Sequence, residues 1–128
     1  MSERLSLYAL DGICHNAERG TYGHECGKAA RWLGTGSSGM VSGFCDDCKI
    51  NGYEAKGKTA WRCIGRPWRV EQWRDGGTFR GWQVVRDLDE GRKAFADMIE
   101  APTGPVDGWR LRIAAQTLAT DLNRRELT

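Results

Sequence analysis

The sequence predicts a single domain of the α+β class, in which β-hairpins come first and helices follow. Glycine-rich segments separate short apolar runs in the first part of the chain, and an alternating pattern typical of strands surrounds Asp75-Gly76-Gly77. Beyond residue 87, apolar residues recur at helical spacing. A chain of 128 residues fits one domain. We divide it into a cysteine-rich part, residues 1–55, and a second part, residues 56–128.

The cysteine-rich part is expected to contain a β-hairpin. Residues 29–33 and 40–44 have the composition of two short strands, and the segment between them, residues 34–39, has the composition of a hairpin loop. The second strand leads directly into Cys45.

Residues 68–86 of the second part are expected to form an antiparallel β-hairpin. Residues 68–74 and 78–86 both alternate and are rich in β-forming residues, and residues 75–77 supply the turn. Residues 59–64 are expected to add another strand, and Pro67 interrupts any continuous ladder between that strand and the hairpin.

Two helices are expected to complete the second part. The first begins at Asp87, an N-cap residue with a glutamate three positions later, and runs to about residue 100, with Leu88, Phe95, Met98 and Ile99 on one face. Residues 101–105 contain two prolines and a glycine and are expected to break it. Residues 109–113 alternate like a short strand, and residues 114–122 have the spacing of a final amphipathic helix.

Composition limits the cellular setting. The sequence has no run of about 18 apolar residues, which predicts no membrane span. Its first residues include early charges and no apolar stretch of signal-peptide length, so we expect a cytoplasmic protein. Because thiols stay reduced in the cytosol, the five cysteines favour a metal site over a disulfide framework. We expect Cys63, which lies outside the cysteine-rich part, to be a small core residue.

Three cysteines have the pattern of a structural zinc site. Cys45 and Cys48 are separated by two residues, so one tight turn can present both thiolates to one ion. Cys26 is followed by Gly27, which lets backbone N–H groups turn toward the sulfur. Ordinary buried thiols are an alternative. A redox dithiol is disfavoured, since the two aspartates between Cys45 and Cys48 would raise the pKa values of the thiols.

The fourth zinc ligand has three candidates, which are Cys14, His15 and His24. Cys14 would complete a set of four thiolates, and His15 would give three thiolates and one imidazole. Because these two residues are neighbours, they are not expected to bind the same ion together. His24 lies only two positions before Cys26, and this close spacing makes it the weakest candidate.

Residues 14–48 resemble a group of small zinc-ribbon proteins common in bacteriophage and prophage genomes. The resemblance rests on Cys14-His15, Arg19-Gly20-Thr21-Tyr22-Gly23, Cys26-Gly27-Lys28-Ala29-Ala30 and Cys45-Asp46-Asp47-Cys48. It implies a zinc-ribbon-like hairpin and zinc ligands at His15, Cys26, Cys45 and Cys48. Ala29 stands where the group usually has proline. The resemblance supplies a metal and a context rather than an activity.

Residues 56–86 are strongly basic. They carry eight Lys/Arg against two Asp/Glu, a net charge of +6. The flanking ranges carry five against seven and six against eight, a net charge of −2 each. Guanidinium groups bind phosphates and exposed aromatic rings stack on bases, so arginines interleaved with tryptophans indicate a nucleic-acid surface. The candidate binding residues are Arg62, Arg66, Arg69, Trp73, Arg74 and Arg80.

A packing role for the same segment is the alternative. In a hairpin with one packed face, Trp68, Val70, Trp82 and Val84 would be core residues. The arginines would then pair with acidic residues elsewhere in the chain, such as Asp87, Asp89 and Glu90.

The sequence carries no HExxH, GxSxG or deaminase motif, so we expect a non-enzymatic protein with structural Zn²⁺. Its expected role is binding nucleic acid or a nucleoprotein through the basic segment. The alternative is a phage-encoded inhibitor or adaptor that docks on a host protein, such as a defence complex in the manner of an anti-CRISPR. A metalloenzyme with an open zinc site is the third possibility.

Overall fold

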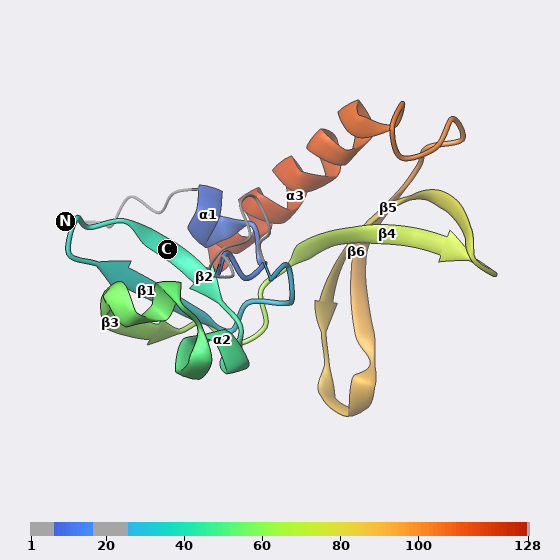
Figure 1. The fold of residues 1–128 in the computed structure, drawn as a ribbon. Helices are drawn as coiled ribbons and strands as arrows, with labels where there is room; N and C mark the ends of the chain where they lie inside the picture. The colour runs from blue at the N-terminus through green and yellow to red at the C-terminus, as the bar shows by residue number, and fades with distance from the viewer. Residues whose placement is uncertain (1–6, 17–25, 128) are drawn as a thin grey trace.

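The computed structural model describes residues 7–16 and 26–127 and has the predicted α+β architecture (Figure 1). It contains two antiparallel sheets of three strands each. The elements, in chain order, are α1 (Leu7–Leu10), β1 (Trp32–Gly36), β2 (Val41–Phe44), α2 (Asp46–Asn51), the 3₁₀ turn η1 (Glu54–Gly57), β3 (Lys58–Cys63), β4 (Arg69–Asp75), β5 (Thr78–Asp87), the 3₁₀ turn η2 (Asp89–Gly91), β6 (Lys93–Glu100) and α3 (Trp109–Leu127).

The first sheet has the strand order β2-β1-β3. β1 and β2 form a hairpin, in which Trp32 lies opposite Phe44 and Thr35 opposite Val41. Its first strand covers residues 32–36 instead of the predicted 29–33, so residues 34–36 of the predicted loop belong to the strand. β3 pairs antiparallel with the other edge of β1, placing Cys63 opposite Trp32. The predicted ribbon-like hairpin is therefore part of a three-stranded sheet, whose third strand comes from beyond residue 55.

The second sheet has the strand order β4-β5-β6. β4 and β5 confirm the hairpin predicted over residues 68–86. Gly76 and Gly77 connect them with φ angles of +56° and +87°. Two successive residues with positive φ match the right-handed twist of a hairpin, and glycine adopts this conformation without strain.

The helix predicted from Asp87 to about residue 100 is wrong, because residues 93–100 form strand β6. The chain reverses directly after β5, where Glu90 has φ +63° and Gly91 has φ +72°. These left-handed residues cannot continue a right-handed helix. The Leu88 N–H donates to the Arg92 carbonyl at 2.8 Å, which closes the connection and lets β6 pair with the open edge of β5.

The strand predicted over residues 109–113 is also wrong, because these residues form the first turns of α3. In a strand, the alternation of apolar and basic side chains would place one face in the core and the other in solvent. Here every residue from Trp109 to Ala114 is exposed, so the alternation does not mark a buried face. The helix predicted over residues 114–122 is confirmed, and α3 extends it to 19 residues in all.

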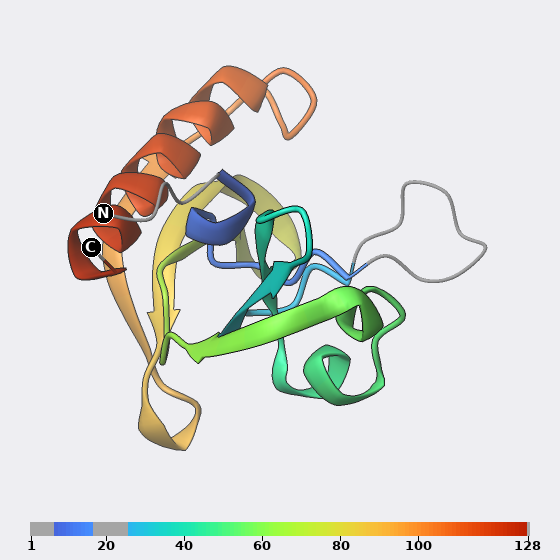
Figure 2. The ribbon, with the colours of Figure 1, turned by 90° about the vertical axis from the view of Figure 1, so that its left-hand side faces the viewer.

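The larger core lies between α3 and the second sheet, which Figures 1 and 2 show side by side. Trp82 and Val84 of β5 pack against Ala115 and Ala119 of α3, and Trp68 and Val70 are partly buried beside them. The packing role predicted for these tryptophans and valines is thereby confirmed. No helix in the described ranges is both long and apolar enough to cross a membrane.

Candidate metal centre

Four cysteine side chains from three segments of the chain meet beside the first sheet. Ile13 and Ala29 form an isolated β-bridge. Cys14 directly follows Ile13, and Cys26 lies shortly before Ala29. Cys45 follows β2 directly and is the N-cap of α2, whose first turn contains Cys48. The hairpin, the bridge and the short helix thus deliver the four thiols to one place.

The spacing of the four sulfur atoms fits a tetrahedral metal ion. They lie within 4.8 Å of one another, and the Sγ atoms of Cys26 and Cys45 are 3.9 Å apart. Four thiolates at the usual Zn–S distance of about 2.3 Å form a tetrahedron with edges of about 3.8 Å. Only small movements separate the thiols from that geometry. Within residues 7–16 and 26–127, no other group of three or more His, Cys, Asp or Glu side chains is arranged to hold a metal ion.

Backbone hydrogen bonds hold the ligand segments together. The Cys14 N–H donates to the Lys28 carbonyl at 2.7 Å, and the Gly27 N–H donates to the Cys14 carbonyl at 3.0 Å. Gly27, which directly follows Cys26, has φ +72°, a left-handed backbone conformation that glycine adopts without strain. On the other side, the Cys48 N–H donates to Sγ of Cys45 at 3.4 Å. An amide that donates to sulfur stabilises the thiolate form a metal requires.

The thiols differ in acidity. Burial raises the pKa of Cys14 to about 11 and also raises the pKa of Cys48. Burial acts on Cys45 as well, but hydrogen bonds from Cys48 and the neighbouring thiols outweigh it and lower the pKa of Cys45. Four thiolates this close together would repel one another strongly without a cation. A metal cation bound among them would supply the opposite charge that lets all four ionise.

Cys14 rather than His15 belongs to this group of four. The Cys14 N–H donates to Lys28 and the His15 N–H donates to Gly43, so the two neighbouring amides point to different segments. Side chains of successive residues in such extended backbone lie on opposite sides. Nε2 of His15 lies 2.5 Å from Oδ2 of Asp11, away from the four thiols. His24, the weakest candidate, lies outside the described residues.

An aromatic shell surrounds the cysteine group. Phe44 is fully buried with Cys14 and Cys45 and meets Trp61 edge to face, with ring centroids 5.1 Å apart. Nε1 of Trp32 donates to Oδ1 of Asp46 at 2.7 Å. Asp46, which directly follows Cys45, therefore holds the indole ring of Trp32 in place beside the cysteine group. Cys63 is exposed, which corrects its expected place in the core.

Most of the arginines predicted to bind nucleic acid pair with carboxylates of the same chain. Arg66 lies 2.8 Å from Asp89, Arg69 lies 3.3 Å from Glu71 and 3.1 Å from Asp87, and Arg80 lies 3.5 Å from Asp75. The alternative predicted from the sequence is therefore confirmed for Asp87 and Asp89, and Glu90 has no arginine partner among the described residues.

Two predicted binding residues have no carboxylate partner within residues 7–16 and 26–127. Arg62 donates to the Leu127 carbonyl at 2.9 Å. Arg74 donates to Gln72 at 2.9 Å and to the Gly77 carbonyl at 3.0 Å. Trp73 is half-buried and lines a cavity with Arg80 at the tip of the β4–β5 hairpin.

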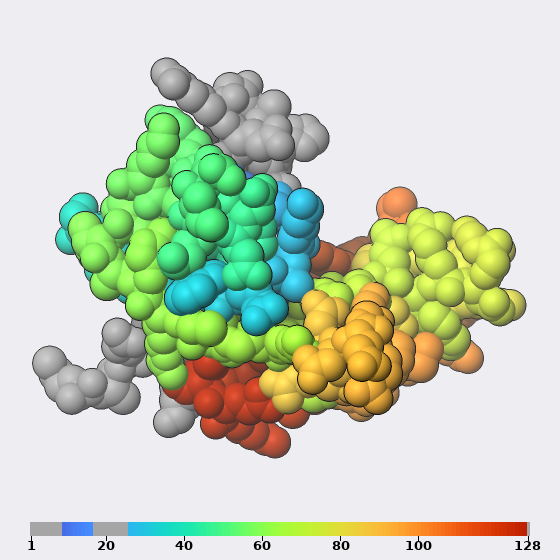
Figure 3. All heavy atoms as spheres, turned by 90° about the horizontal axis from the view of Figure 1, so that it is seen from below, coloured from blue at the N-terminus to red at the C-terminus, as the bar shows by residue number. Residues whose placement is uncertain are grey.

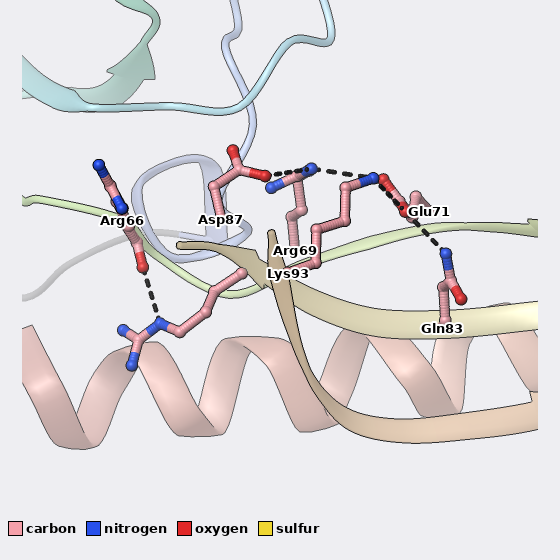
Figure 4. Close-up of polar contacts among 7 residues, drawn as sticks. Arg66, Arg69, Glu71, Gln83, Asp87 and Lys93 are labelled. Atoms are coloured by element: carbon pink, nitrogen blue, oxygen red, sulfur yellow. Dashed lines mark hydrogen bonds and ion pairs between the residues drawn. The ribbon is translucent and has the colours of Figure 1, made fainter. Parts of the chain in front are cut away.

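The pairs around Arg69 form a network on one face of the second sheet (Figure 4). Oε1 of Glu71 accepts hydrogen bonds from Lys93 at 2.8 Å and from Gln83 at 2.7 Å. Burial alone would raise the pKa of Glu71, but the bonds from Lys93 and Gln83 and the charge of Arg69 outweigh it and lower this pKa. This network links all three strands and leaves little uncompensated positive charge there.

Comparison with known proteins adds no relative. No protein-family model matches the chain, and neither the curated proteins nor the solved structures contain a significant match. The functional reading therefore rests on the residues and their arrangement.

Proposed function

We infer that this protein is a non-enzymatic binding protein whose N-terminal half is held together by one structural Zn²⁺ ion. The observation that carries this proposal is the group of four thiols, Cys14, Cys26, Cys45 and Cys48, within 4.8 Å of one another. Thiolates are soft ligands that select zinc over magnesium or calcium. Four protein ligands fill a tetrahedron and leave no position for substrate, which is typical of structural rather than catalytic zinc.

The metal proposal is tested by elemental analysis of protein purified without added metal. We expect about one zinc per chain, because closed four-thiolate sites retain zinc during purification. Unfolding should then be monitored with and without a strong chelator. A metal content far below one per chain, together with identical stability with and without chelator, would refute the proposal.

A protein partner fits the surface better than nucleic acid does. Arg66, Arg69 and Arg80 are already neutralised within the chain, which lowers their capacity to bind phosphates. In contrast, several large apolar side chains are exposed on β6 and near the start of α3. These are Phe95, Met98, Val106, Trp109 and Ile113. Exposed apolar and aromatic residues supply the contacts of protein interfaces.

Nucleic-acid binding is the second candidate, favoured by the net charge of +6 over residues 56–86. Arg62 and Arg74 are its strongest candidate contacts, because within the described part of the chain they bond to neutral groups. The two roles differ in their dependence on salt. Fluorescence anisotropy with labelled DNA and RNA should show weak binding that falls steeply between low and physiological salt if nucleic acid is a nonspecific ligand. Tight binding lost in the double variant Arg62→Ala, Arg74→Ala would favour nucleic acid over a protein partner.

A further inference from the structure

A cavity opens at the tip of the β4–β5 hairpin, far from the cysteine group. Its volume is about 460 Å³. Figure 3 shows this hairpin, in yellow-green, projecting from the body of the molecule, so solutes can approach its tip freely. The cavity is lined by two aromatic residues, three charged residues and two others, namely Trp73, Phe79, Asp75, Arg80, Glu100, Thr78 and Pro102.

The register of the sheet places two of these residues on either side of a glycine. Trp73 of β4 lies opposite Gly81 of β5, and Gly81 lies opposite Glu100 of β6. A Cβ atom at Gly81 would lie 1.9 Å from the Ile99 carbonyl oxygen, so this position requires glycine. The central residue of the row therefore has no side chain, and Trp73 and Glu100, whose backbones are two strand spacings or about 10 Å apart, both line the cavity.

The charges around the cavity favour a cation. Asp75 and Glu100 are acidic and Arg80 is the one base, which leaves a net charge of −1 in the lining. Arg80 pairs with Asp75 at 3.5 Å. Apart from the backbone pairing of β6 with β5, Glu100 makes no hydrogen bond or ion pair with any other described residue, so its carboxylate remains available. Phosphate would meet two carboxylates here, whereas a cation would meet an aromatic ring and a free carboxylate.

We propose that this cavity binds the guanidinium group of an arginine side chain from a protein partner. A guanidinium is planar, so it can stack on the ring of Trp73 while its paired N–H groups donate to Glu100. The combination distinguishes arginine from lysine, whose ammonium lacks the planar pair of donors. The choice of a protein partner rests on the proposed function. The preference for a guanidinium follows from the cavity itself.

NMR titration with N-acetylarginine amide tests the cavity directly. The indole Nε1–H signal of Trp73 is identified by its loss in Trp73→Phe, and its shift is followed as the probe is added. We expect a saturable shift with a dissociation constant in the range of about 1 mM or weaker, since a single exposed ion pair and one stacking contact contribute little free energy. N-acetylcitrulline amide, which has the same shape without the charge, should cause no saturable shift.

The variant Glu100→Gln should weaken binding of the arginine probe about fivefold, because it removes the free carboxylate and keeps the shape. Glu90→Gln is the matched control, since Glu90 is an exposed carboxylate without a side-chain partner among the described residues and lies in η2, before the opposite end of β6 from Glu100. Equal effects of the two variants, no saturable shift at any probe concentration, or an equal response to citrulline or inorganic phosphate would each overturn the proposal. A partner bound elsewhere would leave the proposed function intact.

Discussion

Asn123 of α3 and Trp68, just before β4, are joined by a reciprocal pair of hydrogen bonds. The Trp68 N–H donates to Oδ1 of Asn123 at 2.7 Å, and Nδ2 of Asn123 donates to the Trp68 carbonyl at 2.7 Å. Nδ2 also donates to the carbonyl of Leu10 at 2.6 Å. One buried amide therefore connects α3, the N-terminal segment and the start of the second sheet.

Replacing Asn123 with alanine should destabilise the protein by about 3 kcal/mol, because one buried N–H and two carbonyls lose their partner. Asn123 is only 1% exposed, so water cannot replace these bonds without opening the core. Urea unfolding followed by circular dichroism measures the change. Asn51→Ala is the control, since Asn51 is exposed and its side chain bonds, among the described residues, to Asp47 alone; its effect should stay within about 0.5 kcal/mol.

Gly12 is expected to tolerate no side chain, because its backbone approaches the same Trp68 carbonyl. A Cβ atom at Gly12 would lie 2.0 Å from this oxygen, and Gly12 has φ +76°. Gly12→Ala combines a steric clash with a left-handed backbone and should cost about 3 kcal/mol or more.

Gly39→Ala separates these two effects. Gly39 also has a left-handed backbone, with φ +85°, but a Cβ atom there would meet nothing within 4 Å. Its cost should be about 1 kcal/mol, which reflects the backbone conformation alone. Similar unfolding midpoints for the two alanine variants would show that the approach to Trp68 is looser than the structure describes.

The parts of this fold that the sequence predicts are those set by local chemistry. Two adjacent glycines after Asp75 select a tight hairpin turn, and strand alternation places Trp82 and Val84 on the packed face. Cys26, Cys45 and Cys48 also stand out by their spacing alone. Each of these signals depends on neighbouring residues and not on distant contacts.

The errors concern residues whose structure depends on distant partners. Residues 93–100 contain alanines and a helical spacing of apolar residues. They nevertheless form a strand, because their backbone pairs with the open edge of β5. The choice between Cys14 and His15 depends on which segments their backbones meet, Lys28 for one and Gly43 for the other. The cavity at Trp73 brings together residues of β4, β5 and the end of β6 that lie far apart in the sequence, so it also depends on distant partners.

Changing Cys14 to serine should abolish stoichiometric zinc binding and destabilise the protein by about 3 kcal/mol or more, since a structural site with three thiolates is incomplete. His15→Ala should retain zinc, because His15 lies outside the group of four thiols. Cys63→Ser controls for the loss of a thiol as such, since Cys63 is exposed. Elemental analysis and thermal unfolding measure both effects. Zinc retained in Cys14→Ser but lost in His15→Ala would assign the fourth ligand to the histidine.

The network around Glu71 should make stability depend on pH in the acidic range. The folded protein lowers the pKa of Glu71 below its ordinary value of 4.5, mainly because Lys93 and Gln83 donate to the carboxylate against the opposing effect of burial. A lowered folded pKa means that the ionised group stabilises the fold above the unfolded pKa. This contribution is lost as the pH falls through the folded pKa.

The variant Glu71→Gln removes the ionised group and keeps the shape of the side chain. It should be less stable than the original protein by about 1 kcal/mol near neutral pH, and the difference should shrink steadily below about pH 4.5. Urea unfolding at a series of pH values measures this difference. Glu90→Gln, which alters a carboxylate outside the network, should change stability little. A difference between Glu71→Gln and the original protein that stays constant from neutral to acidic pH would show that the bonds from Lys93 and Gln83 do not favour the ionised form.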